Sequence, residues 1–332
     1  MSQESKNSNQ QHLDAIATNS SGNNTVDSIS TDIGKVVLSN NGGDISSSGG
    51  TSGGGGEEVN SSSKKKDTSC AQNLQLEIIS DDELFQDPPP KEDCQICFLP
   101  MPYPYDHLPH CGAQPMYQPC CGKSICNGCM ITSVDEMKKG NIKKWCPYCR
   151  IPMYRSRKEY LERFKKRIDL NDAEAFYELG QYYTQGGMSI SQDMNKGFQL
   201  LNRAAELGST NAHAPIAVKY LSEYGSGQGV QNLDKAIHHY KLAAIGGNEG
   251  ARHNLGTFAY KTGNMDRAMK HFIIAAKSGH DKSLKKVGEG YKAGHVSKDD
   301  YTKTLRAYQV SVNGMKSVQR TEAGILLTNK VR

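Results

Sequence analysis

Closely spaced cysteine pairs dominate the middle of this chain. Nine of its ten cysteines lie between residues 94 and 149, and eight of these are in closely spaced pairs. Two thiolates separated by two residues can bind one tetrahedral metal ion, and four thiolates complete a structural zinc site. The pattern therefore predicts two zinc ions, held by Cys94, Cys97, Cys120, Cys121, Cys126, Cys129, Cys146 and Cys149.

Disulfide bonds are the alternative use for such cysteines. Residues 1–30 contain no apolar run after a basic start, and no stretch of eighteen apolar residues occurs in the sequence. We therefore expect neither a secretory signal nor a membrane-spanning segment. Outside an oxidising compartment, clustered cysteines bind metal more often than they pair with each other. The sequence thus favours zinc, and a cytoplasmic or nuclear location.

The composition of residues 1–90 is unsuited to a packed core. Ser, Asn, Gly and Asp dominate, and no hydrophobic period is sustained. Such a segment buries too little apolar surface to offset the entropy lost on ordering, which predicts disorder. The acidic stretch 81–85 is expected to be a solvated part of this linker, with a docking motif as the alternative. The net charge of the whole chain, +5, is mild and does not indicate a nucleic-acid partner.

The order of the cysteines resembles that of RING fingers. A first pair is followed by a long loop, a central cluster and a last pair, Cys146-Pro147-Tyr148-Cys149. The resemblance implies a small α+β cross-brace module over 91–153, in which ligands one, two, five and six hold one zinc. Site one would then contain Cys94, Cys97, Cys126 and Cys129. Site two would contain Cys120, Cys121, Cys146 and Cys149.

One ligand of site two stays open. Cys120 and Cys121 are adjacent, and adjacent residues usually point apart, so that binding one metal with both is awkward. The four residues between Cys121 and Cys126 resemble all-cysteine RING variants, which favours Cys121. Cys120 is preferred as the remaining ligand; the alternatives are Cys111, His110 and His107.

The resemblance also implies a binding surface. In RING ubiquitin ligases the first and last ligand loops form a shallow apolar groove for a ubiquitin-conjugating enzyme, which would include Ile96 and Pro147. The residue after the eighth ligand, here Arg150, is often a basic residue that bonds both this enzyme and its thioester-linked ubiquitin. Where many ligases carry a groove-lining Trp, this chain has Ser133. That departure favours the alternative of a non-enzymatic zinc-binding scaffold.

A helix is predicted to connect the module rigidly to the rest of the chain. Within residues 154–170, apolar side chains recur on one face of a helix over 158–168. They are Tyr160, Leu161, Phe164 and Ile168.

The chain repeats itself from residue 171 onward. A helix-capping residue is followed 14 or 15 positions later by glycine in four places: Asp193 to Gly208, Asn232 to Gly246, Asn264 to Gly279 and Asp299 to Gly314. This interval is the length of a four-turn helix between its N-cap and its C-terminal glycine. Partner helices are expected to begin at Asn171 or Asp172, Asn211, Asn248 and Asp281. The period predicts an all-α solenoid of helical hairpins over 171–316.

Residues within the units resemble Sel1-like repeats, which are relatives of tetratricopeptide repeats. The motif Leu179-Gly180-x2-Tyr183-x2-Gly186 returns as Val287-Gly288-x2-Tyr291-x2-Gly294, and Ala-Ala pairs recur at 204, 243 and 275. The resemblance implies an array that binds a protein client. The tail, 317–332, is expected to be partly helical and then frayed.

The sequence contains no nucleophile with a base, no phosphate-binding loop and no dinucleotide fingerprint. We therefore assign no catalytic residue and no small-molecule substrate. The histidines of the array lack the context of a metal site and are expected to face solvent: His213, His238, His239, His253, His271, His280 and His295. The whole chain is predicted to be multi-domain, with a disordered N-terminus, a RING-like zinc module and a helical solenoid. Its expected function is that of a RING-type ubiquitin ligase that recruits a client to its repeats.

Overall fold

The computed structural model describes residues 79–103, 113–141, 143–186, 190–225 and 230–331. The first part is a small cysteine-rich module. It contains an antiparallel hairpin in which Met116 pairs with Ile125, followed directly by one helix. The elements up to this point are α3 (Asp81–Leu84), β1 (Pro115–Gln118), β2 (Lys123–Cys126) and α4 (Asn127–Lys139).

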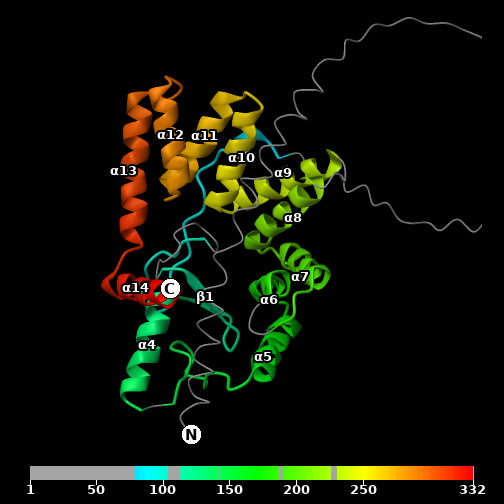
Figure 1. Cartoon of the computed structure of the whole chain (residues 1–332), viewed down its shortest axis with the longest axis vertical. Helices are drawn as coiled ribbons and strands as arrows, with labels where there is room; N and C mark the ends of the chain where they lie inside the picture. The colour runs from blue at the N-terminus through cyan, green and yellow to red at the C-terminus, as the bar shows by residue number, and fades with distance from the viewer. Residues whose placement is uncertain (1–78, 104–112, 142, 187–189, 226–229, 332) are drawn as a thin grey trace, which may run out of the picture.

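The second part is an array of helices that arches over the module (Figure 1). Consecutive helices pack in antiparallel pairs, α6 on α7, α8 on α9, and α10 on α11. The helices are α5 (Arg157–Asp169), α6 (Ala173–Gln185), α7 (Met194–Glu206), α8 (His213–Gly225), α9 (Val230–Ile245), α10 (Glu249–Lys261), α11 (Met265–Lys277), α12 (Asp281–Lys292), α13 (Lys298–Gly314) and α14 (Val318–Val331). A single 3-10 turn, η2 (Thr210–Ala212), precedes α8. No helix in the described ranges has the length and apolar character needed to cross a bilayer.

Several predicted helix starts are confirmed by the side chains that cap them. The carboxylates or amides of Asp172, Asp193, Asn248 and Asn264 each accept a backbone N–H of the first turn. Gly208 and Gly279 adopt the positive φ expected just past a helix end.

Other predicted boundaries are wrong. Asn232 lies inside α9, and Asn211 lies inside η2. α12 is capped by His280, whose ring nitrogen accepts the N–H of Ser283, so that Asp281 is already helical. Ser297 caps α13 in place of Asp299, and this helix continues through Gly314. After α9 the left-handed residue is Gly247, one position beyond the predicted Gly246.

Close approach of paired helices explains the small residues of the repeat. The Ala-Ala pairs at 243 and 275 are buried completely. A Cβ atom on Gly256 would lie 2.7 Å from the ring of Phe272, and one on Gly180 would lie 2.9 Å from Leu201. Packing between α10 and α11, and between α6 and α7, therefore requires glycine at these two positions.

The expectation of a solvated linker at 81–85 is wrong. Leu84 is fully buried in the core formed by α8, α9 and α10, with Phe85 packed beside it. The buried guanidinium of Arg252 donates to the Leu84 carbonyl at 2.7 Å, and Arg267 pairs with Asp81. Residues 79–85 therefore dock on the array, whereas residues 1–78 lie outside the described part.

The predicted helix over 158–168 is confirmed as α5, with Tyr160 and Phe164 buried. The helical part of the predicted tail is confirmed, but the helix, α14, continues to Val331 where fraying was expected. After α13 the chain turns back, and α14 packs against α4 of the module.

The expectation that the histidines of the array face solvent is wrong for several of them. His271 and His280 are buried, at 1% and 2% exposure. The Nδ1 atoms of His213 and His239 lie 3.1 Å apart, between α8 and α9. His295 is exposed, as predicted.

Candidate metal centres

Two short hairpins with the same backbone pattern carry the first and last cysteine pairs. In the first, the N–H groups of Cys94, Phe98 and Met101 donate to the carbonyls of Leu99, Cys94 and Glu92. In the second, Cys146, Arg150 and Met153 donate to Ile151, Cys146 and Lys144. The residue after each pair adopts a positive φ, 54° at Phe98 and 60° at Arg150. This turn brings the two sulfurs of each pair to the same side.

The structure brings the eight predicted cysteines together in two sets of four. Within each set the sulfur atoms all lie within 4.8 Å of one another. Tetrad one is defined as Cys94, Cys97, Cys126 and Cys129, and tetrad two as Cys120, Cys121, Cys146 and Cys149. Each tetrad joins two segments that are distant in sequence, and the tetrads interleave along the chain. These are the two sets that the RING resemblance implies; that they bind zinc stays a prediction.

The sulfur geometry fits a tetrahedral zinc ion. A Zn–S bond of about 2.3 Å places tetrahedral sulfurs about 3.8 Å apart. The distance between Sγ atoms is 3.9 Å for Cys97 and Cys126, and 4.0 Å for Cys121 and Cys146. The Cys149–Cys120 distance is 3.5 Å. A donor set made only of thiol sulfur suits zinc among the divalent ions.

Electrostatics within each tetrad also suit a bound cation. Hydrogen bonding from Cys126 and Cys129 lowers the pKa of Cys94, while the pKa of Cys129 is raised. In tetrad two, hydrogen bonding from Cys120 lowers the pKa of Cys146, and that of Cys120 is raised. One thiolate thus forms at the expense of its neighbours, because the neighbouring thiols donate hydrogen bonds to it and so hold their own protons. A divalent ion would stabilise all four thiolates together.

A tight turn lets adjacent cysteines serve one site. Residues 119–122 connect β1 to β2, and the N–H groups of Cys121 and Gly122 both donate to the Gln118 carbonyl. Gly122 takes a φ of 70° to close this turn. Both Cys120 and Cys121 thereby reach tetrad two. The alternative ligands Cys111, His110 and His107 lie outside the described residues.

Backbone hydrogen bonds to sulfur organise tetrad one. The N–H of Cys126 donates to the Cys94 sulfur at 3.3 Å, and the N–H of Cys129 donates to the Cys126 sulfur at 3.5 Å. Cys126 is also the N-cap of α4. The start of α4 is thus fixed to the tetrad by the same sulfur that would bind the metal.

The three residues predicted to bind a conjugating enzyme lie on the two hairpins. Ile96 and Pro147 are half-buried, and Arg150 is exposed. Sequence reasoning missed three exposed apolar side chains beside them, Phe98, Tyr148 and Ile151, at 73%, 44% and 43% exposure. Their place immediately beside ligand cysteines was a signal that could have identified them.

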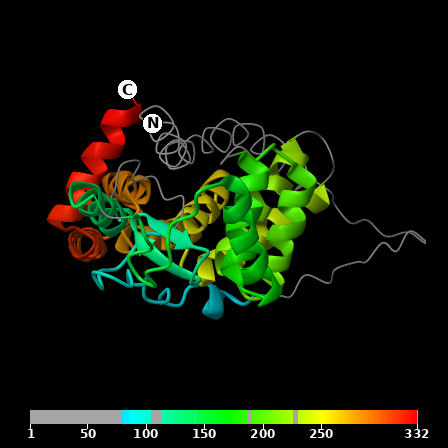
Figure 2. The same cartoon turned by 90° about the horizontal axis from the view of Figure 1, so that it is seen from below.

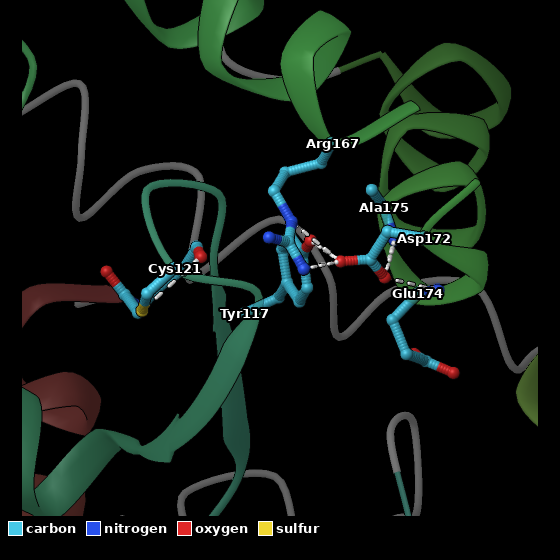
Figure 3. A network of polar contacts seen from close by, with 7 residues as sticks. Tyr117, Cys121, Arg167, Asp172, Glu174 and Ala175 are labelled. Atoms are coloured by element: carbon cyan, nitrogen blue, oxygen red, sulfur yellow. Dashed lines mark hydrogen bonds and ion pairs between the residues drawn. The ribbon is translucent and has the colours of Figure 1, made fainter. Parts of the chain in front are cut away.

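A polar junction fixes the module to the start of the array (Figure 3). The Tyr117 hydroxyl of β1 and the Arg167 guanidinium of α5 both donate to one carboxylate oxygen of Asp172, each at 2.8 Å. The other oxygen accepts from the first turn of α6, at Glu174 and Ala175. Burial, followed by the bond to Asp172, raises the pKa of Tyr117. One carboxylate therefore caps α6 and holds the module to α5.

Comparisons with known proteins identify the array. A family model described as the Sel1 repeat matches residues 173–209, 212–248 and 250–280, which are α6–α7, η2 to α9, and α10–α11. The unit formed by α12 and α13 lies beyond these matches. A search of curated proteins gives no match.

Solved structures give partial similarities. A Sel1 repeat protein from Oxalobacter formigenes is 22% identical, with a TM-score of 0.38, over 52% of this chain and 77% of that one. The protective antigen c5321 of uropathogenic Escherichia coli, which displays an SLR fold, is 17% identical, with a TM-score of 0.37, over 60% and 44%. Immunity protein Pa5087 from Pseudomonas aeruginosa is 13% identical, with a TM-score of 0.29, over 48% and 76%. The helices that follow the cysteine module thus include three Sel1 repeats.

Proposed function

We propose that this protein is a zinc-dependent RING-like ubiquitin ligase whose Sel1 repeats hold a protein client. The observation that carries the proposal is the interleaving of the two tetrads. In this arrangement the first and last cysteine pairs belong to different sites yet lie on matching hairpins. The proposed role of zinc is structural: bound at both sites, it would hold these hairpins at a fixed spacing.

Exposed apolar side chains on the two hairpins support a docking surface. Phe98 lies on the first hairpin, and Tyr148 and Ile151 lie on the second. Ile96 and Pro147 lie beside them. Apolar residues that gather on a surface mark protein-binding sites more often than singly exposed ones do. A ubiquitin-conjugating enzyme is the partner that the RING resemblance implies for this surface.

Arg150 would contact the ubiquitin rather than contribute to docking of the conjugating enzyme. Its left-handed backbone conformation lies in the turn of the second hairpin, and its side chain is exposed. A guanidinium has a planar set of donors that can bond two acceptors at once. It would hold the thioester-linked ubiquitin in a reactive pose. The amine of a client lysine on the repeats then attacks the thioester carbonyl with the help of proximity, forming an amide bond and releasing the thiol of the conjugating enzyme. The chain itself then needs no nucleophile.

The array would present the client in a cytoplasmic or nuclear setting. Repeat solenoids commonly bind proteins along their extended surfaces. Here the start of the array is fixed to the module through Asp172. The client and the conjugating enzyme would therefore be held at a defined separation, which favours transfer to particular lysines.

Ubiquitin discharge from charged conjugating enzymes tests the proposal. We expect Ile96→Ala to weaken docking and Arg150→Ala mainly to slow transfer, because one contact is apolar and the other is made to the ubiquitin. Leu170→Ala and Arg155→Ala are matched controls, since both side chains are exposed elsewhere on the surface. Bound zinc is counted in every variant, so that loss of the fold is recognised.

A non-enzymatic scaffold is the second candidate. The observation in its favour is Ser133, on α4, where many ligases have a Trp that lines the groove. A scaffold would retain both metals and bind a client without promoting discharge. If a panel of conjugating enzymes shows no discharge with the intact two-zinc protein, the scaffold replaces the ligase.

A further inference from the structure

The last helix of the chain closes on tetrad one. α14 packs against α4, and the two views place these helices side by side (Figure 1 and Figure 2). A Cβ atom on Gly128 would lie 2.9 Å from Cγ and 3.0 Å from Cα of Arg320. Gly128 directly precedes the ligand Cys129 in α4. The C-terminal helix therefore approaches the candidate metal centre at backbone distance.

Arg320 makes the polar part of this contact. Its side chain is only 2% exposed. One guanidinium nitrogen donates to the carbonyls of Pro100 and Met315, at 2.7 and 2.8 Å. A second nitrogen donates to the Leu99 carbonyl at 2.9 Å and lies 3.4 Å from the Cys97 sulfur, while the buried Nε makes no hydrogen bond to the described residues. A single buried cation thus links the α13–α14 turn to the first hairpin.

We propose that Arg320 is a positioning residue that couples docking of α14 to metal binding at tetrad one. The proposal rests on the metal-binding part of the proposed function, but not on ligase activity. A buried guanidinium is stable only when its donors find acceptors and its charge finds a partner. Three carbonyls supply acceptors, and the Cys97 sulfur lies 3.4 Å from the guanidinium.

The geometry makes the coupling specific to tetrad one. Leu99 and Pro100 directly follow Cys97, so Arg320 holds the segment that leaves this ligand. Groups that hydrogen-bond metal ligands orient them and tune the metal, and their loss weakens binding about 10–100-fold. In tetrad two, the sulfur–carbonyl contact is made inside the module, from Cys121 to Gln118. Tetrad two is therefore an internal control.

Coupling of this kind acts in both directions. If metal at tetrad one favours docking of α14, then docked α14 favours the metal by the same factor. The array is thereby attached to the module at both ends. Arg163 of α5 donates to the Pro152 carbonyl of the second hairpin at 2.7 Å, and Arg320 holds the first hairpin. Loss of metal from tetrad one would release the α14 end.

Thiol alkylation of the full-length chain in graded zinc chelator tests the proposal. Peptide mass spectrometry assigns each modified cysteine to its tetrad. In the Arg320→Met variant we expect the cysteines of tetrad one to become reactive at a chelator concentration about 10–100-fold lower than in the wild type. The cysteines of tetrad two should become reactive at the same concentration as in the wild type. Amide exchange in residues 318–331 should rise in the same variant. Arg203→Met, at an exposed arginine of α7, is the matched control and should change neither readout.

The conservative variant separates coupling from simple packing. Arg320→Lys keeps the charge and should restore part of the protection of tetrad one. With cobalt in place of zinc, Arg320→Met should shift the thiolate-to-metal charge-transfer band, which a distant packing defect would leave in place. Unchanged amide exchange in α6–α11 shows that the variants are folded.

Two results would overturn the proposal, and they are distinguishable. Two bound zincs, with equal protection of tetrad one in wild type and Arg320→Met, would leave Arg320 as a packing residue only. Absence of zinc from the wild-type chain would remove the metal-binding part of the proposed function as well. Failure of ubiquitin discharge alone would leave the coupling intact.

Discussion

The cysteine module and the helical array are held together by different forces. The buried cluster around the tetrads consists of cysteines with Met101 and Ile125, and few other apolar side chains of the module are buried. The cores of the array are built from Leu, Ala, Tyr and Phe side chains on paired helices. A module with so little apolar material cannot offset its chain entropy by burial alone. The array can, and the two parts should therefore respond differently to the same disturbance.

Removal of metal should have the largest effect and should separate the two regions. We expect a strong chelator to abolish amide protection in the hairpins at 92–101 and 144–153 and in α4. Structural zinc contributes on the order of 10–16 kcal/mol of folding free energy in isolated fingers. Helices α6 to α11 should keep their protection, because their cores contain no ligand cysteine. Hydrogen exchange of the full-length chain measures both regions in one experiment.

Restored zinc provides the control for this experiment, since protection of the module should return. Parallel loss of protection in α6 to α11 would contradict the comparison. It would mean that the array depends on the module for its own stability.

Glycines at matching positions of two repeats test packing inside the array. Gly256→Ala should destabilise the protein by about 1–2 kcal/mol, because the new methyl meets the buried ring of Phe272 at 2.7 Å. Gly288→Ala is the matched control, since the nearest atom there is 3.7 Å away on Tyr301. Alanine favours a helix interior over glycine by about 1 kcal/mol, so the control should be stabilised. Urea unfolding followed by circular dichroism measures the difference.

Equal effects at Gly256 and Gly288 would show that the array tolerates expansion at every helix crossing. Stability changes of opposite sign in the two variants would confirm that the unit formed by α12 and α13 packs less closely than the matched repeats.

Buried histidines should make the array sensitive to mild acid. Burial, followed by the charges of Arg252 and Arg267, lowers the pKa of His271 to about 3. The unfolded chain takes up this proton near pH 6.5, whereas the folded chain does not, so stability is present above pH 6.5 and is lost as pH falls toward 3. The loss due to His271 should be ~1 kcal/mol at pH 5.5.

His271→Leu should reduce the loss of stability as the pH falls below 6.5, as measured by the urea midpoint at several pH values. His295→Leu, at an exposed histidine, should leave the slope unchanged. If both variants retain the wild-type slope between pH 6.5 and 5, other groups cause the acid sensitivity. His213 and His239, whose pKa values burial lowers to about 4, would then be the next to test.

Local signals in the sequence predicted the features that depend on neighbouring residues. Cap residues such as Asp193 and Asn264 marked helix starts because their side chains bond the adjacent turn. The spacing within each cysteine pair predicted that its two thiols share one site, and the RING resemblance implied which pairs combine into the two tetrads. Asn232 misled the prediction because an equally suitable cap residue can lie inside a helix.

Contacts between distant segments had no such signal. Leu84 stands in a short acidic stretch with no periodic pattern, and its burial is explained only by the core that α8, α9 and α10 form around it. In the sequence, nothing distinguishes Arg320 from other arginines. Its role follows only from the contact between α14 and the first hairpin. Both features arise from tertiary packing, which hydrophobic periodicity along one segment does not encode.

The metal content of the full-length chain tests the central claim most directly. Native mass spectrometry should find two zinc ions per chain, one for each tetrad. Cys120→Ala should retain one zinc, whereas Cys111→Ala should retain both. A wild-type chain with one zinc or none would contradict the two-site module, and loss of one zinc in Cys111→Ala would reassign the last ligand of tetrad two.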